Sequence, residues 1–131
     1  MVINPKALLE EMKYLNDAGI KTDKMHISDR AHVTLPYHIE IDELEEEMRG
    51  AARIGIRVGE FINEPLFKKR LEETLAFKKK QYPGLQCTAE EIFEEYKEYA
   101  KVIKPMVCDT GIFLDEAFQA KKKILFEGAQ G

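Results

Sequence analysis

The sequence predicts an α/β protein that is predominantly helical, with several amphipathic helices and two short strands in a single domain over residues 1–131. Three observations predict this class. Apolar residues recur at intervals of three and four, as on one face of a helix. Prolines and glycines divide these stretches into separate elements. Short apolar runs at residues 26–28 and 124–126 each follow a helical stretch, which is the order of an α/β unit.

The first helix is expected to begin at Asn4 and Pro5, an N-cap and first-turn pair, and to end at Gly19. Leu8, Met12 and Leu15 recur on one of its faces. A linker and the strand at residues 26–28 follow. No strand is expected before this helix.

Residues 25–50, MHISDRAHVTLPYHIEIDELEEEMRG, contain the most specific pattern. Asp29 and Arg30 indicate a polar turn after the strand, and Pro36 prevents a continuous helix through Leu35. A new helix is therefore expected after the proline, with Gly50 as its stop. Its predicted apolar stripe comprises Ile41, Leu44 and Met48.

The second half of the chain predicts three helices. After a turn or broken helix punctuated by Gly55 and Gly59, Pro65 opens a helix that ends near residue 80. Thr88 and Glu91 have the spacing of a capping box, and the helix they open extends to residue 107. Its tyrosines, Tyr96 and Tyr99, fit a core stripe better than a stacking platform. A last helix at residues 112–121 precedes the strand at residues 124–126.

Composition excludes several classes of function. The chain is 44% apolar and 34% charged with a net charge of −4, which argues against a general nucleic-acid surface. No apolar run approaches the ~20 residues of a membrane span, and the first 19 residues lack a signal-peptide pattern. We therefore expect a cytoplasmic protein that binds neither nucleic acid nor membrane. Cys87 and Cys108 stand alone, so reduced thiols are expected.

Two groups of residues invite a catalytic or metal-binding interpretation. His26, His32 and His38 are evenly spaced, but Pro36 breaks any helix joining the last two, and structural histidines fit better than a metal site. The carboxylates of residues 40–47 lie on a solvated helix face, which supplies neither the cleft nor the raised pKa of a catalytic acid. We expect no metal and no cofactor in this chain.

Three motifs carry a resemblance to a known family. ISDRAHVTLPYH followed by LEEEMRG, AARIGIRVGEF at residues 51–61, and ILFEGAQG at residues 124–131 occur in the order found in the adenylosuccinate synthetases. The resemblance runs over the whole chain and covers a middle portion of the family's polypeptide. It implies a ligase of purine biosynthesis that joins inosine monophosphate and L-aspartate, with GTP and magnesium.

The resemblance also implies two substrate-binding residues. The family's arginine at the position of Arg53 reaches across a dimer interface to the inosine monophosphate of the other subunit, and the glutamine at the position of Gln130 contacts the same nucleotide. If the family resemblance is set aside, the sequence favours Arg53 as a surface arginine that supports a turn. Arg57 is a weaker second candidate with a structural interpretation.

The departures from the family predict an incomplete site. The 131 residues contain neither the glycine-rich GTP loop nor the catalytic aspartate and histidine, and a Gly- and Thr-rich loop is missing between Gly50 and Ala51. We expect a loop-deleted fragment, inactive alone, that binds inosine monophosphate weakly if at all. Strand edges and the Leu8 face should favour a homo-oligomer. The competing interpretation is a non-catalytic helical interaction module.

Overall fold

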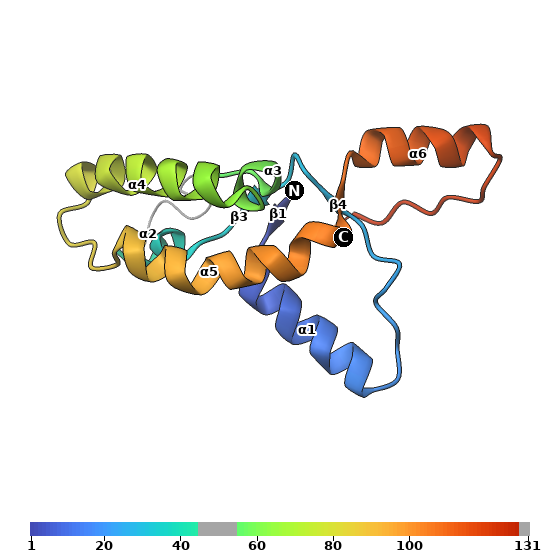
Figure 1. The fold of residues 1–131 in the computed structure, drawn as a ribbon, viewed down its shortest axis with the longest axis horizontal. Helices are drawn as coiled ribbons and strands as arrows, with labels where there is room; N and C mark the ends of the chain where they lie inside the picture. The colour runs from blue at the N-terminus through green and yellow to red at the C-terminus, as the bar shows by residue number, and fades with distance from the viewer. Residues whose placement is uncertain (45–54, 129–131) are drawn as a thin grey trace.

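The computed structural model describes residues 1–44 and 55–128 (Figure 1). Its helices are α1 (Pro5–Asp17), α2 (Pro36–Leu44), α3 (Val58–Phe61), α4 (Glu64–Gln81), α5 (Ala89–Ile103) and α6 (Thr110–Gln119), with a 3-10 turn η2 (Lys104–Met106) after α5. Its strands are β1 (Val2–Ile3), β2 (Ile27–Ser28), β3 (His32–Val33) and β4 (Val107–Cys108). The predominantly helical α/β class is confirmed.

The strands form two separate parallel pairs. β1 pairs with β3, and β2 pairs with β4 in a register that places Ile27 opposite Val107. The strand predicted at residues 26–28 is therefore confirmed as β2. The expectation that no strand precedes the first helix is wrong, because β1 does so. A two-residue strand is too short to show an alternating pattern, so β1, β3 and β4 left no signal in the sequence.

The strand predicted at residues 124–126 is wrong. Residues 122–128 have no regular structure, and the side chains of Leu125 and Phe126 are 93% and 77% exposed. A strand needs a neighbour for its backbone hydrogen bonds. The neighbour that β2 uses is β4, which follows η2 directly.

The helix starts follow the capping residues. The side chain of Asn4 accepts a hydrogen bond from the backbone of Ala7 at 3.3 Å, and Asn63 caps α4 in the same way through Leu66 at 3.2 Å. Thr88 accepts from the backbone of Glu91 at 3.2 Å, which confirms its half of the capping box. Each cap satisfies a backbone donor that the first turn leaves free.

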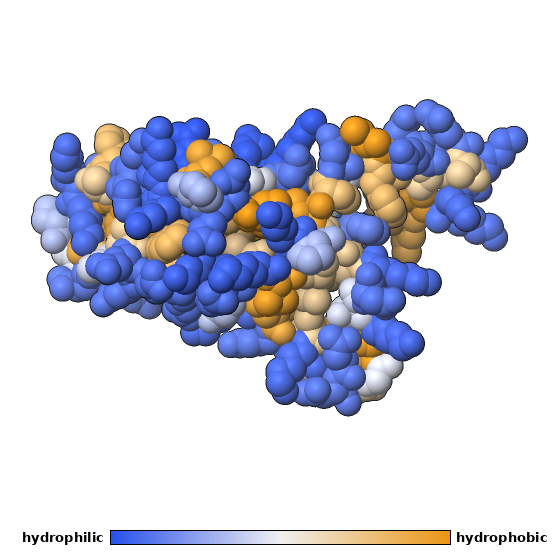
Figure 2. Space-filling view, viewed as in Figure 1, coloured by the Kyte–Doolittle hydropathy of each residue, from blue (hydrophilic) through white to orange (hydrophobic). Residues whose placement is uncertain are grey.

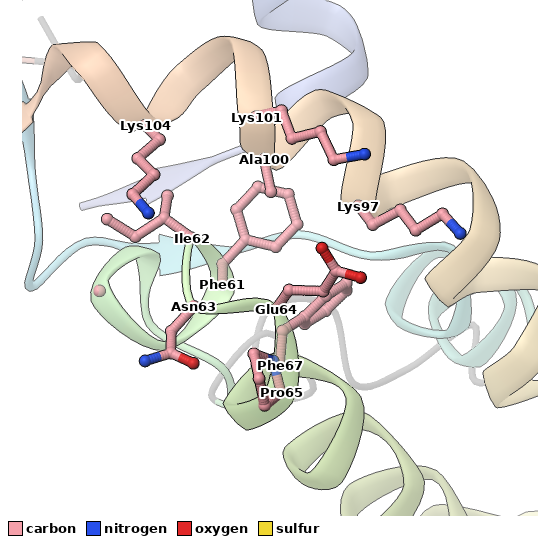
Figure 3. Close-up of a pocket in the computed structure, with 11 residues that line it drawn as sticks. Phe61, Ile62, Asn63, Glu64, Pro65, Phe67, Lys97, Ala100, Lys101 and Lys104 are labelled. Atoms are coloured by element: carbon pink, nitrogen blue, oxygen red, sulfur yellow. The ribbon is translucent and has the colours of Figure 1, made fainter.

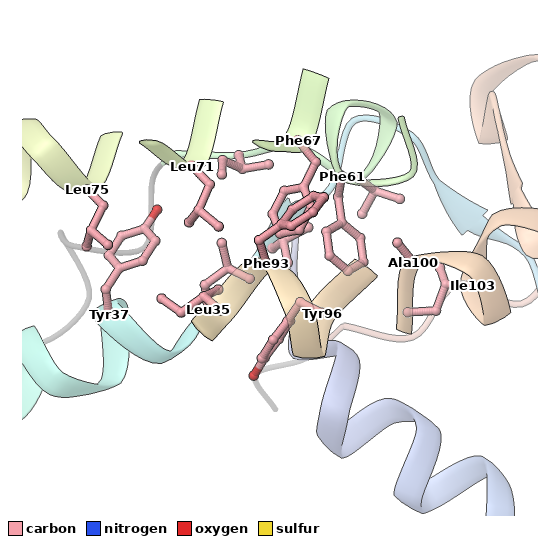
Figure 4. Packing of buried hydrophobic residues seen from close by; sticks show 14 of the residues in the cluster. Leu35, Tyr37, Phe61, Phe67, Leu71, Leu75, Phe93, Tyr96, Ala100 and Ile103 are labelled. Carbon is pink, nitrogen blue, oxygen red and sulfur yellow. The ribbon is translucent and has the colours of Figure 1, made fainter. Parts of the chain in front are cut away.

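The main core lies between α4 and α5 and extends to α2, α3 and β3 (Figure 4). Phe67, Leu71 and Leu75 of α4 point into this core, and the rings of Phe61 and Phe67 meet edge to face with centroids 4.9 Å apart. Tyr96 is buried, as the core interpretation of the tyrosines requires, and Tyr99 is partly buried against the same cluster.

The stripe predicted for α2 is only partly correct. Ile41 is fully buried, whereas Leu44 is 51% exposed and Met48 lies outside the described residues. Because the helix begins at Pro36 itself, Tyr37 and His38 join Ile41 on the buried face. Gly19 ends α1 as expected, with a φ of 82° that favours glycine.

Candidate functional site

The two residues that the resemblance assigns to substrate, Arg53 and Gln130, lie outside the described residues, as does the Gly50–Ala51 junction. The described segment that follows Arg53 is firmly attached to β3. The carbonyl of Ile56 accepts from the backbone of Val33 at 2.9 Å, and the backbone of Val58 donates to the carbonyl of Ala31 at 2.8 Å. Ile56 and Val58 are therefore held against β3 and the residue that precedes it.

Arg57 stands at the start of α3 and forms an isolated antiparallel bridge with His32. Its backbone N–H donates to the carboxylate of Glu60 at 3.0 Å, and its guanidinium donates to the carbonyl of Arg30 at 3.1 Å. These contacts support the structural interpretation of Arg57, because they fix the turn that leads into α3.

Two buried side chains approach position 55 closely, which explains why a glycine stands there. A Cβ at this position would lie 3.1 Å from the hydroxyl of Tyr37 and 3.6 Å from Nε2 of His38. Tyr37 is fully buried, and burial raises the pKa of its phenol well above the ordinary value. The sequence pattern marked Gly55 only as turn punctuation, so it missed this packing role.

The three histidines occupy three different environments. His38 is fully buried, and its Nδ1 accepts from the backbone of Leu35 at 3.0 Å, which confirms a structural histidine. The ring of His26 lies 4.4 Å from that of Phe113, and His32 belongs to β3. Within residues 1–44 and 55–128, no group of three or more His, Cys, Asp or Glu side chains is placed to hold a metal.

Glu40 joins α2 to the loop before α5. Its carboxylate accepts from the backbone N–H groups of Gln86 and Cys87, which are close to it in space but 46 and 47 positions away in the chain. The Gln86 bond lowers the pKa of Glu40. Glu40 was expected on a solvated acidic helix face, and this contact was not predicted, because nothing local in the sequence marks a partner so distant.

The cysteines are both free and partly buried. Burial first, and then the hydrogen bond and charge of Glu40, raise the pKa of Cys87 to about 12. The thiol therefore remains protonated near neutral pH and is a poor nucleophile.

A groove of about 450 Å³ runs between the start of α4 and α5 (Figure 3). Its base is lined by Phe61 and Phe67. Its side is lined by Lys97 and Lys101 of α5 and by Lys104 of η2. Lys97 and Lys101 are already paired with Glu94 and Glu98, at 2.6 and 2.8 Å. The groove therefore has little free positive charge, although Lys104 points toward Ile62.

No helix in the described part of the chain is both long and apolar enough to cross a membrane.

Comparisons with known proteins agree with one another. The family model for adenylosuccinate synthetase matches residues 1–131. An adenylosuccinate synthetase of Bacillus cytotoxicus is 46% identical and one of Streptococcus sanguinis 43% identical, each over 100% of this chain and 36% of the relative. The structure of fully ligated adenylosuccinate synthetase from Plasmodium falciparum covers 98% of this chain and 35% of its own, with 26% identity and a TM-score of 0.82.

The chain therefore spans about a third of the length of the curated relatives that it matches. The match extends over 153 residues, whereas the chain has 131, a difference of 22. The relatives thus contain additional residues within the matched region.

Proposed function

Because the chain belongs to the adenylosuccinate synthetase family, we propose that it is part of an enzyme that ligates inosine monophosphate and L-aspartate with GTP and magnesium in the cytoplasm. In this reaction the 6-oxygen of the nucleotide is first phosphorylated. The aspartate amine then attacks the carbon that bears it, and the oxygen leaves as phosphate. The observation that carries the proposal is the family match over all 131 residues. The competing helical interaction module is not favoured by these comparisons.

Within this enzyme we propose that Arg53 and Gln130 contact inosine monophosphate. The planar guanidinium of an arginine offers a fork of donors that matches phosphate and ribose oxygens, and a glutamine amide both donates and accepts. Arg53 lies two positions before Gly55, where the chain joins the segment attached to β3. The proposed target of Arg53 is the nucleotide bound by a second copy.

The loop predicted to be missing between Gly50 and Ala51 accounts, in this proposal, for the 22 additional residues of the relatives. Since that loop contributes a substrate-binding threonine in the family, and the 131 residues contain no GTP loop, the isolated chain should be inactive. A spectrophotometric assay with inosine monophosphate, aspartate, GTP and magnesium should give no adenylosuccinate. Product above background that depends on the added chain would contradict this.

Residual nucleotide binding tests the residue assignment separately. Calorimetry should detect at most weak binding of inosine monophosphate. If binding is detected, Arg53→Ala should lower the affinity. Tight binding that Arg53→Ala leaves unchanged would remove the proposed role of Arg53 without affecting the family assignment.

The proposed enzyme is a homo-oligomer, and exposed apolar surface supports self-association. Figure 2 shows apolar residues along the projecting α6 among charged ones. The exposed apolar residues of α6 are Ile112, Phe113, Leu114 and Phe118, and the segment that follows it adds Leu125 and Phe126. Leu8 is instead partly buried against the core, so α6 is the better candidate surface. Sedimentation equilibrium should show a dimer or larger species, and a monomer at high micromolar concentration would contradict it.

A further inference from the structure

We propose that a pocket between the start of α3 and the middle of α4 binds a phosphate-class oxyanion. This arginine pocket is lined by Gly55, Ile56, Arg57, Glu60, Arg70 and Thr74, and its volume is about 290 Å³. Liquid water occupies about 30 Å³ per molecule, so the space corresponds to roughly ten waters. It can hold a phosphate together with part of its hydration shell.

Glu60 orders the two arginines of the pocket. Its Oε1 accepts from Nε of Arg70 at 2.9 Å, and its Oε2 accepts from the backbone of Arg57 at 3.0 Å. The side chain of Glu60 is 24% exposed and that of Arg70 is 52% exposed. The carboxylate is thus the more enclosed member of the pair and holds the guanidinium by its Nε. Within the described residues, no contact occupies the terminal amino groups of Arg70.

The remaining donors and the charge favour an anion. Arg57 is held by its hydrogen bond to the carbonyl of Arg30, and Thr74 lies one helical turn beyond Arg70 on the same face of α4. Two guanidinium groups and one carboxylate leave one net positive charge in the lining, in a chain whose net charge is −4. A planar guanidinium with two free amino groups matches the geometry of phosphate oxygens.

The lysine groove between α4 and α5 is a weaker candidate for the same ligand. Two of its three lysines are neutralised by glutamates one turn away on α5, at 2.6 and 2.8 Å. The arginine pocket keeps an excess positive charge because Glu60 pairs with the guanidinium of Arg70 and accepts only a backbone N–H from Arg57. The inference goes beyond the proposed synthetase reaction, since no substrate contact is assigned there to Arg70 or Thr74.

The test is a titration of the 131-residue chain with inorganic phosphate at constant ionic strength, balanced with sodium chloride. Backbone amide and arginine Nε signals should show a saturable shift centred on residues 55–60 and 70–74. Arg70→Gln should weaken phosphate binding by about tenfold or more, as expected for loss of a charged hydrogen bond. Arg70→Lys should rescue it only in part, because the charge remains but the fork is lost.

Lys69→Gln is the matched control, because it removes the same charge from the neighbouring position of α4, outside the pocket. It should change phosphate binding by less than about twofold, as for an exposed charge. If Arg70→Gln does not fold, Thr74→Val is a second variant that tests the pocket. It should weaken phosphate binding by a few fold. The inference is overturned by the lack of a saturable shift. It is equally overturned if the pocket variants lower the affinity no more than Lys69→Gln does, since binding would then reflect overall charge alone.

Discussion

The α4–α5 pair and α6 show that the apolar content of a helix does not decide its burial. α4 has a modest apolar face, yet Phe67, Leu71 and Leu75 are at most 2% exposed. α6 reads TGIFLDEAFQ, with more apolar residues per turn, and none of its residues is buried. The difference lies in what faces each helix. α4 has α5 opposite it, whereas α6 projects beyond β4 (Figure 1).

The largest expected effect separates the two regions by core truncation. Phe67→Ala should lower the free energy of unfolding by about 3–5 kcal/mol, because it removes a fully buried ring and leaves a cavity. Phe118→Ala in α6, where the ring is 74% exposed, should change it by less than about 0.5 kcal/mol. Urea denaturation of both variants at low protein concentration measures the contrast. Equal effects would mean that α6 is packed in solution.

A second test concerns the tight contact at Gly55. Gly55→Val should destabilise the protein by about 1–3 kcal/mol, because its side chain would press on the hydroxyl of Tyr37. Tyr37→Phe removes that hydroxyl, so the double variant should recover part of the loss. Thermal unfolding of the two single variants and the double variant gives the coupling between them. Strict additivity would show that the strain lies elsewhere.

These packing roles show where sequence reasoning stopped. The helix starts at Asn4 and Thr88 were predictable because capping is local, with donor and acceptor three positions apart. The start of α4 was predicted to within one residue, because Pro65 stands at its second position. Gly55 and Glu40 were not, since their partners depend on how distant segments pack. The strand wrongly predicted at residues 124–126 has the same cause, because a strand needs a pairing partner and the local sequence does not specify one.

The candidate site divides in the same way. Arg53 and Gln130 were assigned by family resemblance and lie outside the described residues, so their roles stay predictions. The arginine pocket had no signal in the sequence. Its members come from a turn and a helix, and only the fold brings Glu60 between Arg57 and Arg70.

A smaller effect is expected from the Glu40 contact, with a defined pH dependence. Its pKa is lower in the folded protein than its ordinary value, so its contribution is present above the unfolded pKa and is lost as pH falls through the folded pKa. Glu40→Gln should cost at most about 1 kcal/mol at pH 7, because the carboxylate is partly exposed to water. Glu116→Gln on the exposed face of α6 is the control. Urea denaturation should show a shallower acid-side loss of stability only for Glu40→Gln.

The smallest effect concerns the end of α6. Lys121 has a φ of 53°, and the bonds from Lys121 to Phe118 and from Lys122 to Ala117 repeat those around Gly19 at the end of α1. Since glycine adopts this backbone without strain, Lys121→Gly should stabilise the last turn of α6 by about 0.5 kcal/mol. Amide exchange in α6 should slow while the global unfolding free energy stays constant. Unchanged exchange would show that the turn does not limit α6.

The pairing of β2 with β4 joins segments 80 positions apart, from Ile27 to Val107. Closing so long a loop carries a larger entropic barrier than joining α4 to α5 through a short connection. The helical pair should therefore form early during folding, and β2–β4 late. In the native state the same two-residue pair should open first, as a local unit of low stability. Since α6 begins just after β4, each such opening would detach α6 and the residues that follow it while the core remains folded.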